Sequence, residues 1–217
     1  GFSGVRPVAA SLQRADMGGS LNTRELMDIA LVLRSARNAR EYGAAEEKNV
    51  ISHLFDCLTP NRALEERITT SIVGEDELAD SASTELASIR RHIRVTESKV
   101  RDILQKIISS SQAKYLQEAI ITQRNDRYVV PVRAECKNDV PGLVHDVSSS
   151  GATFFIEPMG VVQANNEFIE LQAKELKEIQ RILAELSAEA AARKEDILWD
   201  YDALVHLDVI FARGQLS

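Results

Sequence analysis

The chain has 217 residues, of which 44% are hydrophobic and only 5% are aromatic, and its formal net charge is -7. This length fits one ordinary domain or two small ones, and the abundance of Ala, Leu, Glu and Arg favours helices over a large globular core. The acidic balance excludes a protein whose overall charge attracts nucleic acid, so any such binding must be local.

The first 82 residues predict a small helical core. Residues 1–20 contain Pro7 and a pair of adjacent glycines, so we expect mostly loop there. Asn22 is followed three residues later by Glu25, which is the spacing of a capping box. This spacing predicts the start of the first long helix.

That helix should stop near Gly43, because glycine favours the left-handed backbone that ends many helices. Apolar residues over 50–58 predict a second short helix, which must end before Pro60. Asn61 is a suitable cap for a third helix, and residues 71–80 fit a minimal hairpin. Together these elements indicate a small bundle.

The segment 83–118 predicts a long outgoing helix. Ser83 is its expected cap, and the helix should run to about Ala113. Its apolar residues recur at alternating three- and four-residue steps, which makes a narrow seam that needs a facing helix. The seam residues are Leu86, Ile89, Ile93, Thr96, Val100, Ile103 and Ile107.

The segment 161–217 repeats this pattern and predicts a continuous return helix from about Val161 to beyond Phe211. Its seam residues are Ile169, Gln172, Leu176, Ile179, Leu183, Leu186, Ala190, Arg193 and Ile197. Its first 30 residues or so match the length of the outgoing helix. The rest should dock on the helical core through Trp199, Leu204, Leu207, Ile210 and Phe211.

Residues 119–160 lie between the two helices and are rich in β-branched and aromatic residues, which predicts a β-rich tip. The expected strands are 120–123, 128–134, 143–147 and 153–156. Pro131 indicates an edge position or a bulge, because proline cannot donate to a strand ladder. The sequence therefore predicts a mainly α fold: a helical bundle and a long antiparallel coiled coil that carries a small β subdomain.

Several strings in and after this tip occur in a characteristic order. They are Arg127-Tyr-Val-Val-Pro-Val-Arg133, Gly142-Leu-Val-His-Asp-Val-Ser-Ser-Ser-Gly151, Thr153-Phe-Phe-Ile-Glu-Pro158 and Val161-Val-Gln-Ala-Asn-Asn166. This succession resembles the second bacterial branch of MutS, the endonuclease-type paralogue of the mismatch-repair ATPase. Similar strings occur at Gly18-Gly19 with Glu25-Leu26, at Asp80-Ser-Ala-Ser83 with Ile89-Arg90, and at Leu207-Asp-Val-Ile-Phe211, so the resemblance covers the whole chain.

The resemblance implies a fragment that holds the core and lever of a MutS-like protein and a β clamp at the end of the lever. In that family a P-loop ATPase domain follows the lever, and its dimerisation lets two arms surround a nucleic acid. An Smr nuclease domain usually ends the protein. We therefore expect ATP, Mg²⁺ and self-association to belong to domains outside this chain.

The resemblance also implies the partners, which are branched or double-stranded DNA or ribosomal RNA. The associated roles are suppression of homologous recombination, DNA repair and rescue of collided ribosomes. In the alternative hypothesis, the tip is a structural arm that contacts the ribosome or another protein, and DNA is irrelevant to it.

The chain is not expected to be an enzyme or to bind a cofactor or metal. It contains no Gly-x-x-x-x-Gly-Lys-Ser/Thr phosphate loop, and its histidines form no metal-ligand cluster. His145 and Asp146 are adjacent in a strand and should point to opposite faces, so they do not orient a nucleophilic serine. We expect Glu157, beside Pro158, to cap the return helix through the helix dipole.

The candidate nucleic-acid contacts are cations and hydroxyl groups in and beside the tip: Lys114, Arg124, Arg127, Arg133, Lys137, Ser148, Ser149 and Ser150. Acidic neighbours dilute this charge, and a solvated charged surface is the alternative interpretation. Between residues 85 and 106 six Lys and Arg residues stand against three Asp and Glu residues. These cations fit the inner wall of a ring around nucleic acid, but we favour pairing with acidic residues of the return helix.

The location is expected to be cytoplasmic, in association with the nucleoid or ribosomes. Cys57 and Cys136 have neither metal-type spacing nor a disulfide framework, which suits a reducing compartment. No apolar run approaches the length of about 18 residues that a membrane span needs, so no membrane partner is expected.

Overall fold

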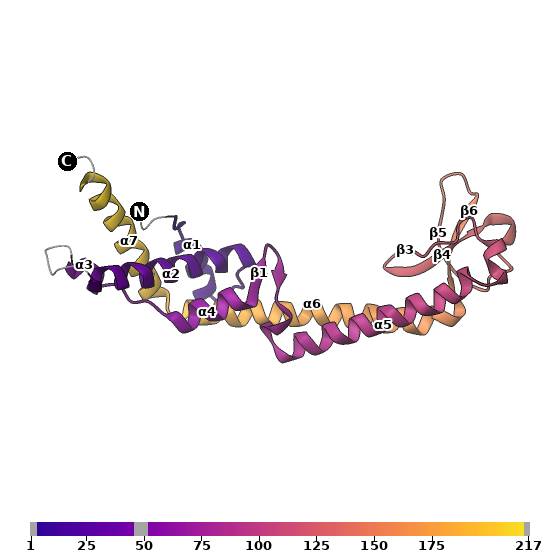
Figure 1. Cartoon of the computed structure of the whole chain (residues 1–217), viewed down its shortest axis with the longest axis horizontal. Helices are drawn as coiled ribbons and strands as arrows, with labels where there is room; N and C mark the ends of the chain where they lie inside the picture. The colour runs from indigo at the N-terminus through magenta and orange to yellow at the C-terminus, as the bar shows by residue number, and fades with distance from the viewer. Residues whose placement is uncertain (1–3, 46–51, 215–217) are drawn as a thin grey trace. The chain divides into compact units, whose positions relative to one another are not determined.

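The computed structural model describes residues 4–45 and 52–214 (Figure 1). The chain is mainly α-helical with a small antiparallel β subdomain, as predicted. It divides into two compact units, Gly1–Thr84 with Glu178–Ser217 and Glu85–Lys177. We call these the helical unit and the sheet unit.

The helical unit contains most of the helices. Its elements are α1 (Ala9–Asp16), α2 (Thr23–Ala45), α3 (Ser52–Asp56), α4 (Arg62–Ser71), β1 (Ile72–Gly74), β2 (Glu77–Leu78), the second half of α6 (Val162–Ala191) and α7 (Lys194–Gly214). The prediction of mostly loop over residues 1–20 missed α1, although residues 4–8 and 17–20 are non-helical. Leu12 and Ala15 are buried on one side of this helix, so its short apolar face is sufficient to form it, and the glycine pair follows only after it ends.

The predicted caps of α2 and α4 are confirmed. Asn22 Oδ1 accepts a hydrogen bond of 2.8 Å from the Glu25 backbone N–H, and Glu25 Oε1 accepts one of 3.2 Å from the Asn22 N–H. Asn61 Oδ1 accepts a bond of 3.0 Å from the Leu64 N–H. The predicted stop at Gly43 was wrong, because α2 continues to Ala45.

Gly43 serves close packing instead of helix termination. A Cβ atom at this position would lie 2.3 Å from the Phe55 Cβ atom, so only glycine lets α3 approach α2. Of the predicted helix over 50–58, α3 covers Ser52–Asp56, with Phe55 buried. Positions 50 and 51 lie outside the described residues.

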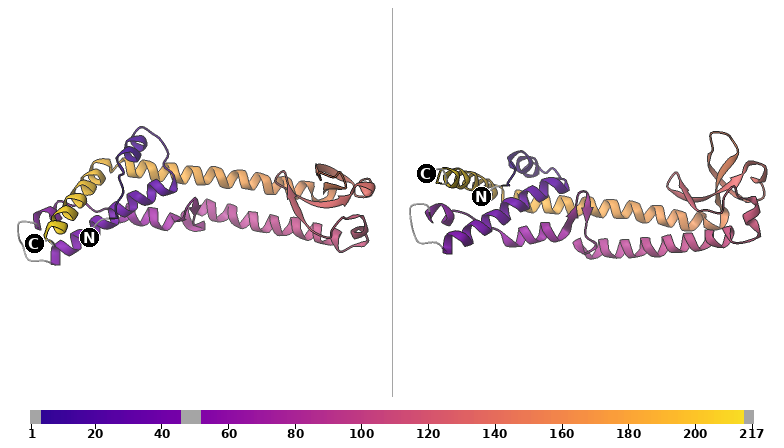
Figure 2. Two further views of the ribbon diagram at one scale, coloured as in Figure 1. Left: turned by 90° about the horizontal axis from the view of Figure 1, so that it is seen from above. Right: turned by 45° about the horizontal axis from the view of Figure 1, so that its top comes forward.

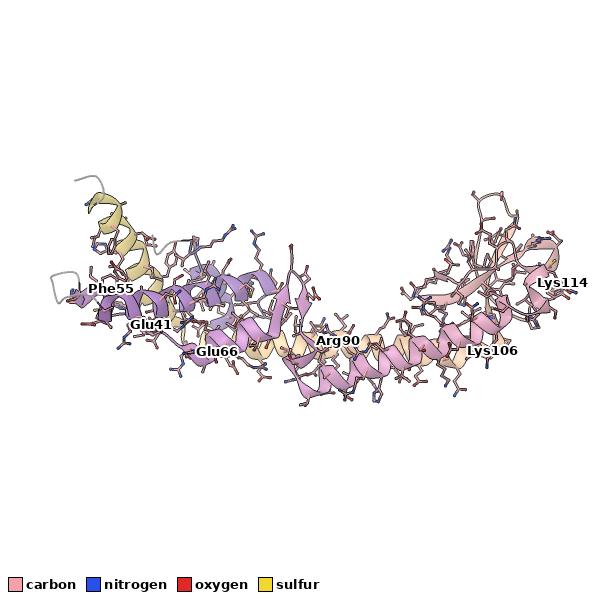
Figure 3. All side chains as sticks on the ribbon, in the orientation of Figure 1. Glu41, Phe55, Glu66, Arg90, Lys106 and Lys114 are labelled. Carbon is pink, nitrogen blue, oxygen red and sulfur yellow. The ribbon has the colours of Figure 1, made fainter. Side chains whose placement is uncertain are left out.

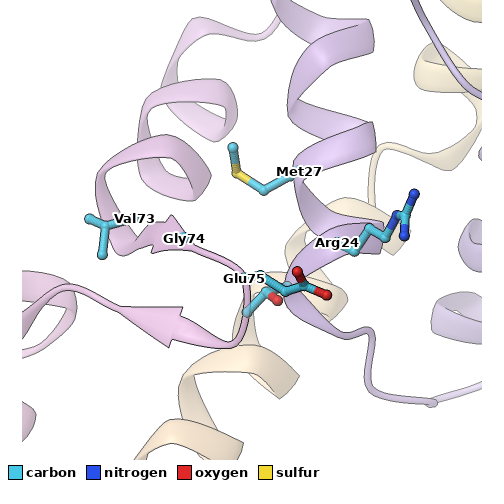
Figure 4. Close-up of a pocket in the computed structure, with 6 residues that line it drawn as sticks. Arg24, Met27, Val73, Gly74 and Glu75 are labelled. Carbon is cyan, nitrogen blue, oxygen red and sulfur yellow. The ribbon is translucent and has the colours of Figure 1, made fainter.

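The predicted hairpin over 71–80 is present as β1 and β2, which pair antiparallel. The Asp76 backbone N–H donates a bond of 3.0 Å to Thr23 Oγ1, so the turn of the hairpin is held by the first residue of α2. An open pocket of about 420 Å³ lies beside this contact, with Met27 and Val73 among its lining residues (Figure 4).

The end of the predicted return helix docks within the helical unit. Leu204 and Leu207 are fully buried, and the Phe211 ring packs 6.3 Å from the Phe55 ring, centroid to centroid. Trp199 Nε1 donates a bond of 2.9 Å to the Cys57 carbonyl. These contacts agree with the predicted docking of this segment on the N-terminal helices.

The return helix is not continuous, contrary to prediction. α6 ends at Ala191 and α7 begins at Lys194, although no glycine or proline marks the break. Lys194 Nζ lies 2.6 Å from Gln13 Oε1 and 3.5 Å from Asp16 Oδ2, both in or beside α1. The break therefore lies where the chain contacts α1, a tertiary feature that local sequence does not encode.

In the sheet unit, α5 (Thr84–Ile108) lies beside the first half of α6 (Figures 1 and 2). Arg90 Nε bonds Glu175 Oε2 at 3.1 Å, and Thr96 Oγ1 bonds Glu167 Oε1 at 3.4 Å. Residue numbers rise along α5 as they fall along α6, so the two helices are antiparallel. α5 ends at Ile108, five residues before the predicted Ala113, and a 3-10 helix (η2, Ser111–Tyr115) follows.

The seam of α5 was predicted correctly. The seam of the return segment was placed one residue too late as far as Leu183, whereas its later positions Leu186, Ala190 and Ile197 are buried as predicted. Gln172 and Leu176 are exposed, whereas Ala164, Phe168 and Glu178 are buried. Arg90 on Glu175 satisfies one inward carboxylate within the sheet unit. Because α6 has polar residues at some inward positions, a prediction from hydrophobic spacing alone chooses the row of residues next to the one that faces inward.

The sheet unit carries four strands, β3 (Thr122–Arg124), β4 (Arg127–Arg133), β5 (Gly142–Val147) and β6 (Thr153–Pro158). Their order is β3-β4-β6-β5, and every neighbouring pair is antiparallel. The register shifts between Val144 and Asp146 in β5, which is a bulge. Pro131 lies beyond the β3–β4 pairing, opposite Phe155, and the bulge is in β5 instead.

One face of this sheet packs on the two helices. Its core combines residues of α5, the strands and the start of α6: Val100, Leu104, Leu116, Tyr128, Val130, Val132, Val140, Ile156, Val161, Ala164 and Phe168. The Tyr128 and Phe168 rings pack edge to face with centroids 5.4 Å apart. This single core fixes the sheet against the helices of its own unit.

Candidate nucleic-acid interface

A buried carboxylate organises the sheet. Glu157 on β6 is fully buried, and its Oε2 accepts bonds of 2.7 Å from Arg127 Nη1 and from Asn165 Nδ2. Its Oε1 lies 2.8 Å from His145 Nε2. Burial alone raises the pKa of Glu157, but the bonds from His145, Arg127 and Asn165 outweigh it, and the pKa lies below the usual value for Glu.

The expectation that Glu157 caps the return helix was therefore wrong. Both oxygens of its side chain are occupied within the sheet unit, and α6 begins only at Val162. His145 belongs to the same network instead of lying free at a strand end. The cluster has no nucleophile, and its geometry is that of a structural tie between β4, β5, β6 and α6.

The Asn165 side chain binds the backbone of Tyr128 where a neighbouring strand would otherwise do so. Its Oδ1 accepts a bond of 3.3 Å from the Tyr128 N–H, and its Nδ2 donates one of 3.0 Å to the Tyr128 carbonyl. The β4–β6 ladder ends at Val130, so these two backbone groups of Tyr128 would otherwise lose partners in a buried place. One amide side chain satisfies both.

The turn between β3 and β4 is tied across the sheet to β5. Arg124 Nε lies 3.3 Å from Asp146 Oδ2, and its guanidinium stacks 4.0 Å from the centroid of the Phe155 ring. Asn125 Nδ2 donates a bond of 2.8 Å to the His145 carbonyl. Arg124 and Arg127, two of the predicted nucleic-acid contacts, thus bind acidic partners within the sheet unit.

Comparisons with known proteins bear on the whole chain. No family model matches it. Proteins named endonuclease MutS2 match it over its full length: the one from Acetivibrio thermocellus is 46% identical over 222 residues, and the one from Ruminiclostridium cellulolyticum is 47% identical over 221 residues. A third, from Agathobacter rectalis, is 44% identical over 221 residues.

The chain matches one segment of the MutS2 proteins. The resemblance to the second bacterial branch of MutS is thereby confirmed. Each match covers 100% of this chain and 28% of the relative, so the chain spans little more than a quarter of the length of these MutS2 proteins.

The other predicted cations of this MutS2 segment gather at one end of the sheet. Arg133 ends β4, and its Cα atom pairs with that of Thr153 at the start of β6. A bridge between Leu116 and Val132 brings the segment after Lys114 to the same end (Figure 3 labels Lys114). Lys137 follows in the next turn, with its Nζ 5.4 Å from the centroid of the Phe154 ring.

These three cations are exposed and pair with no acidic side chain among the described residues. Arg133 Nε donates a bond of 3.2 Å to the Leu116 carbonyl, which orients the guanidinium without neutralising it. Lys114 Nζ lies 5.2 Å from the Tyr115 ring centroid. Lys114, Arg133 and Lys137 are therefore the predicted cations that keep free charge.

The predicted serine turn of the MutS2 segment lies at this same end, between β5 and β6. Ser148 Oγ accepts a bond of 3.0 Å from the Thr153 N–H and lies 3.4 Å from Ser150 Oγ. Gly151 has a φ of 74°, a left-handed backbone that favours glycine. Ser148 and Ser150 thus shape the turn, and Ser149 and Ser150 are both exposed.

Charge is divided unevenly between the two units. Residues 85–177 hold 13 Lys and Arg against 12 Asp and Glu, a net charge of +1, while the remaining residues hold 13 against 21, a net charge of -8. The acidic balance of the MutS2 segment thus belongs to the helical unit. Electrostatic repulsion of a polyanion is weaker at the sheet unit than the whole-chain charge indicates.

The organising residues of the tip were missed by sequence reasoning. His145, Glu157 and Asn165 stand singly in the sequence, and their grouping depends on strand order. The signal that was available is an acidic residue inside the apolar string Phe-Phe-Ile-Glu-Pro, because a carboxylate in a buried strand requires partners.

Two further findings concern other classes of function. Within residues 4–45 and 52–214, no helix is both long and apolar enough to cross a membrane. In the same part of the chain, no three His, Cys, Asp or Glu side chains are grouped to hold a metal ion.

Proposed function

We propose that this chain is the lever-and-clamp segment of a MutS2-type protein and that its tip contacts the phosphate backbone of nucleic acid without sequence specificity. The supporting observation is the group of Lys114, Arg133 and Lys137 beside the serine turn, which are exposed and have no acidic partner within residues 4–45 and 52–214. Phosphate contacts from such groups carry no base information. The segment itself performs no chemistry in this proposal.

The whole protein extends this proposal. An ATPase domain with ATP and Mg²⁺ and an Smr nuclease domain would lie outside this chain, and dimerisation of the ATPase domain would bring two tips to one nucleic acid. The isolated segment has only one arm and lacks a second tethered contact that would raise the effective concentration, so it should bind weakly. The proposed role is suppression of recombination through branched DNA, or DNA repair, at the nucleoid.

The experiment compares charge-matched variants of a complete MutS2-family protein that carries this segment. The tip triple is Lys114→Gln, Arg133→Gln and Lys137→Gln. The control triple is Arg6→Gln, Arg24→Gln and Arg34→Gln, which are exposed residues of the helical unit without acidic partners among the described residues. Both triples change the net charge equally.

Binding to branched DNA is measured by fluorescence anisotropy at several salt concentrations. The tip triple should bind more weakly than the control triple. Its slope of log affinity against log salt should fall by about 0.9 for each lost phosphate contact on duplex DNA. Equal affinities and equal slopes for the two triples would remove the tip from the interface.

A second candidate function rests on the outer strand β5. Leu143, Val144 and Val147 are 47%, 49% and 42% exposed, an unusual amount of apolar surface for a sheet edge. This surface suits a structural arm that contacts a protein partner or the ribosome. A photo-crosslinker at Ser149 separates the two functions, because nucleic-acid adducts support the clamp and protein adducts support the arm.

A further inference from the structure

The outgoing helix α5 carries a second group of unpaired cations. Arg91, Lys99 and Lys106 are exposed and make no hydrogen bond or ion pair with any described residue (Figure 3 labels Lys106). Two other cations of this helix are bound: Arg90 pairs with Glu175 at 3.1 Å, and Arg101 pairs with Glu97 at 3.3 Å. The expected pairing with acidic residues of α6 therefore does not account for all the charge on α5.

The three free cations share one face of the helix. At about 100° per residue, Arg91, Lys99 and Lys106 fall within roughly a quarter turn of each other, opposite the buried seam of Val100 and Leu104. At about 1.5 Å per residue, Arg91 and Lys99 stand roughly 12 Å apart along the axis, and Lys99 and Lys106 about 10 Å apart. Cations spaced in this way along one helix face can contact successive phosphates of a helical polyanion, whereas they do not surround a small ligand.

The positive balance of the sheet unit comes from this helix. α5 holds six Lys and Arg against three Asp and Glu, an excess of three. The rest of residues 85–177 holds seven against nine, a deficit of two. Within the sheet unit, long-range attraction for phosphate is therefore stronger at α5 than at the strands.

We infer that the face of α5 formed by Arg91, Lys99 and Lys106 is a phosphate-binding stripe that contacts the backbone of a nucleic-acid duplex. This inference rests on the proposed function of the tip and adds a second contact surface to it. The stripe reads only phosphate charge, so it binds duplex DNA and duplex RNA by the same chemistry.

The test adds a third variant to those above. The α5 triple is Arg91→Gln, Lys99→Gln and Lys106→Gln, and it removes the same charge as the tip triple and the control triple. Glutamine is a good helix former, so these exposed positions should remain helical, and far-UV circular dichroism verifies this. Binding of labelled duplex DNA and duplex RNA of one sequence is measured from 50 to 200 mM salt.

If all three side chains contact phosphate, the salt slope on duplex DNA falls by about 2.7, at about 0.9 for each contact. The ratio of the affinity of the control triple to that of the α5 triple then falls by about 40-fold between 50 and 200 mM salt. The duplex that binds the unaltered protein more tightly identifies the source of the phosphate.

An α5 triple that binds like the control triple overturns the inference. If the tip triple is weakened in the same experiment, the proposed function stands without the stripe. If neither triple is weakened, both fail. A defect of the α5 triple that is independent of salt, or that follows a change in self-association measured by sedimentation, also overturns the stripe, because lost phosphate contacts must release fewer counterions.

Discussion

Replacing Arg127 by methionine should destabilise the sheet unit by about 3 kcal/mol. The substitution keeps most of the apolar stem but removes the bonds of 2.7 Å to Glu157 Oε2 and 2.6 Å to Asn166 Oδ1. Loss of one partner from a buried ion pair costs about 3–5 kcal/mol, because the other charge stays buried. We expect the lower end, because the Arg127 side chain is 23% exposed and His145 and Asn165 still bind the carboxylate.

The matched control is Arg124→Met on the same hairpin. Arg124 also pairs with an acid, but its side chain is 37% exposed and that of Asp146 is 50% exposed. Exposed pairs of this kind contribute about 1 kcal/mol or less. A double-mutant cycle of Arg127→Met with Glu157→Gln should then give a coupling energy of about 2 kcal/mol. The reason is that the neutral amide of the Glu157→Gln variant is not destabilised by the loss of the Arg127 charge, whereas the Glu157 carboxylate is.

Two reporters separate the units in one sample. Amide hydrogen exchange at Val130 and Ile156 reports the sheet unit, and protection there should fall by about 150-fold for a loss of 3 kcal/mol. Trp199, the only tryptophan of the chain, reports the helical unit by fluorescence and should change little. A loss below 1 kcal/mol, a coupling near zero, or equal shifts at both reporters would refute the account of Glu157 as a buried, partnered charge.

Three further outcomes are expected. Lowering the pH should weaken the sheet unit: the folded pKa of Glu157 lies below its usual value, so its contribution is present above the ordinary Glu pKa of about 4.3 and is lost as pH falls through the lower folded value. Hydrogen exchange at Val130 measures this, and an acid response that is unchanged in Glu157→Gln would contradict it. Burial raises the pKa of Asp200 despite its bonds from Thr59, so the folded state loses stability as pH rises from the ordinary Asp pKa through the folded value. Asp200→Asn should therefore raise the free energy of unfolding by up to about 1 kcal/mol at pH 8, and this gain should vanish below about pH 4. Trp199 fluorescence during urea unfolding tests this, and a gain that persists at low pH would count against it. Finally, Gly142→Ala should cost the sheet unit about 1–3 kcal/mol, because the new Cβ would lie 2.1 Å from the Glu157 carbonyl oxygen; wild-type exchange rates in this variant would show that the strands can separate at no cost.

The sequence predicted those parts of the fold that depend on local pattern. The seam from Leu86 to Ile107 is apolar at nearly every inward position, so periodicity located it correctly. The strands of the tip were predicted for the same reason, since β-branched and aromatic residues dominate them. The caps at Asn22 and Asn61 also follow from short, local bonds.

The parts that were predicted wrongly depend on contacts between distant residues. The inward face of α6 includes Glu175, which hydrophobic spacing places on the outward face. A carboxylate is tolerated at this inward position because Arg90 lies opposite and binds it. The break before Lys194 depends on α1. Neither partner is visible from the local sequence, so the period of the seam was correct throughout, but its phase was wrong as far as Leu183.

The candidate interface shows the same division. Sequence reasoning found the cations of the tip but could not tell which of them keep free charge. Arg127 is bound because strand order places Glu157 beside it, whereas Arg133, among the residues the structure describes, bonds only a carbonyl oxygen. The distribution of acidic partners, and not the number of cations, therefore decides which side chains remain available to phosphate.

The pairing of Asn165 with Tyr128 has a consequence for how the tip can vary. The end of the β3–β4 hairpin next to Tyr128 is held by the Asn165 amide on the first turn of α6, by Arg127 on Glu157 and Asn166, and by the bond from its turn to β5. A hairpin of another length or sequence should therefore fit here only if it keeps Arg127, because the Glu157 carboxylate beneath it is buried and needs that partner. Variation without loss of stability is thus expected in β3 and in the turn at 125–126, whereas the start of β4 is fixed by its contacts with β6 and α6.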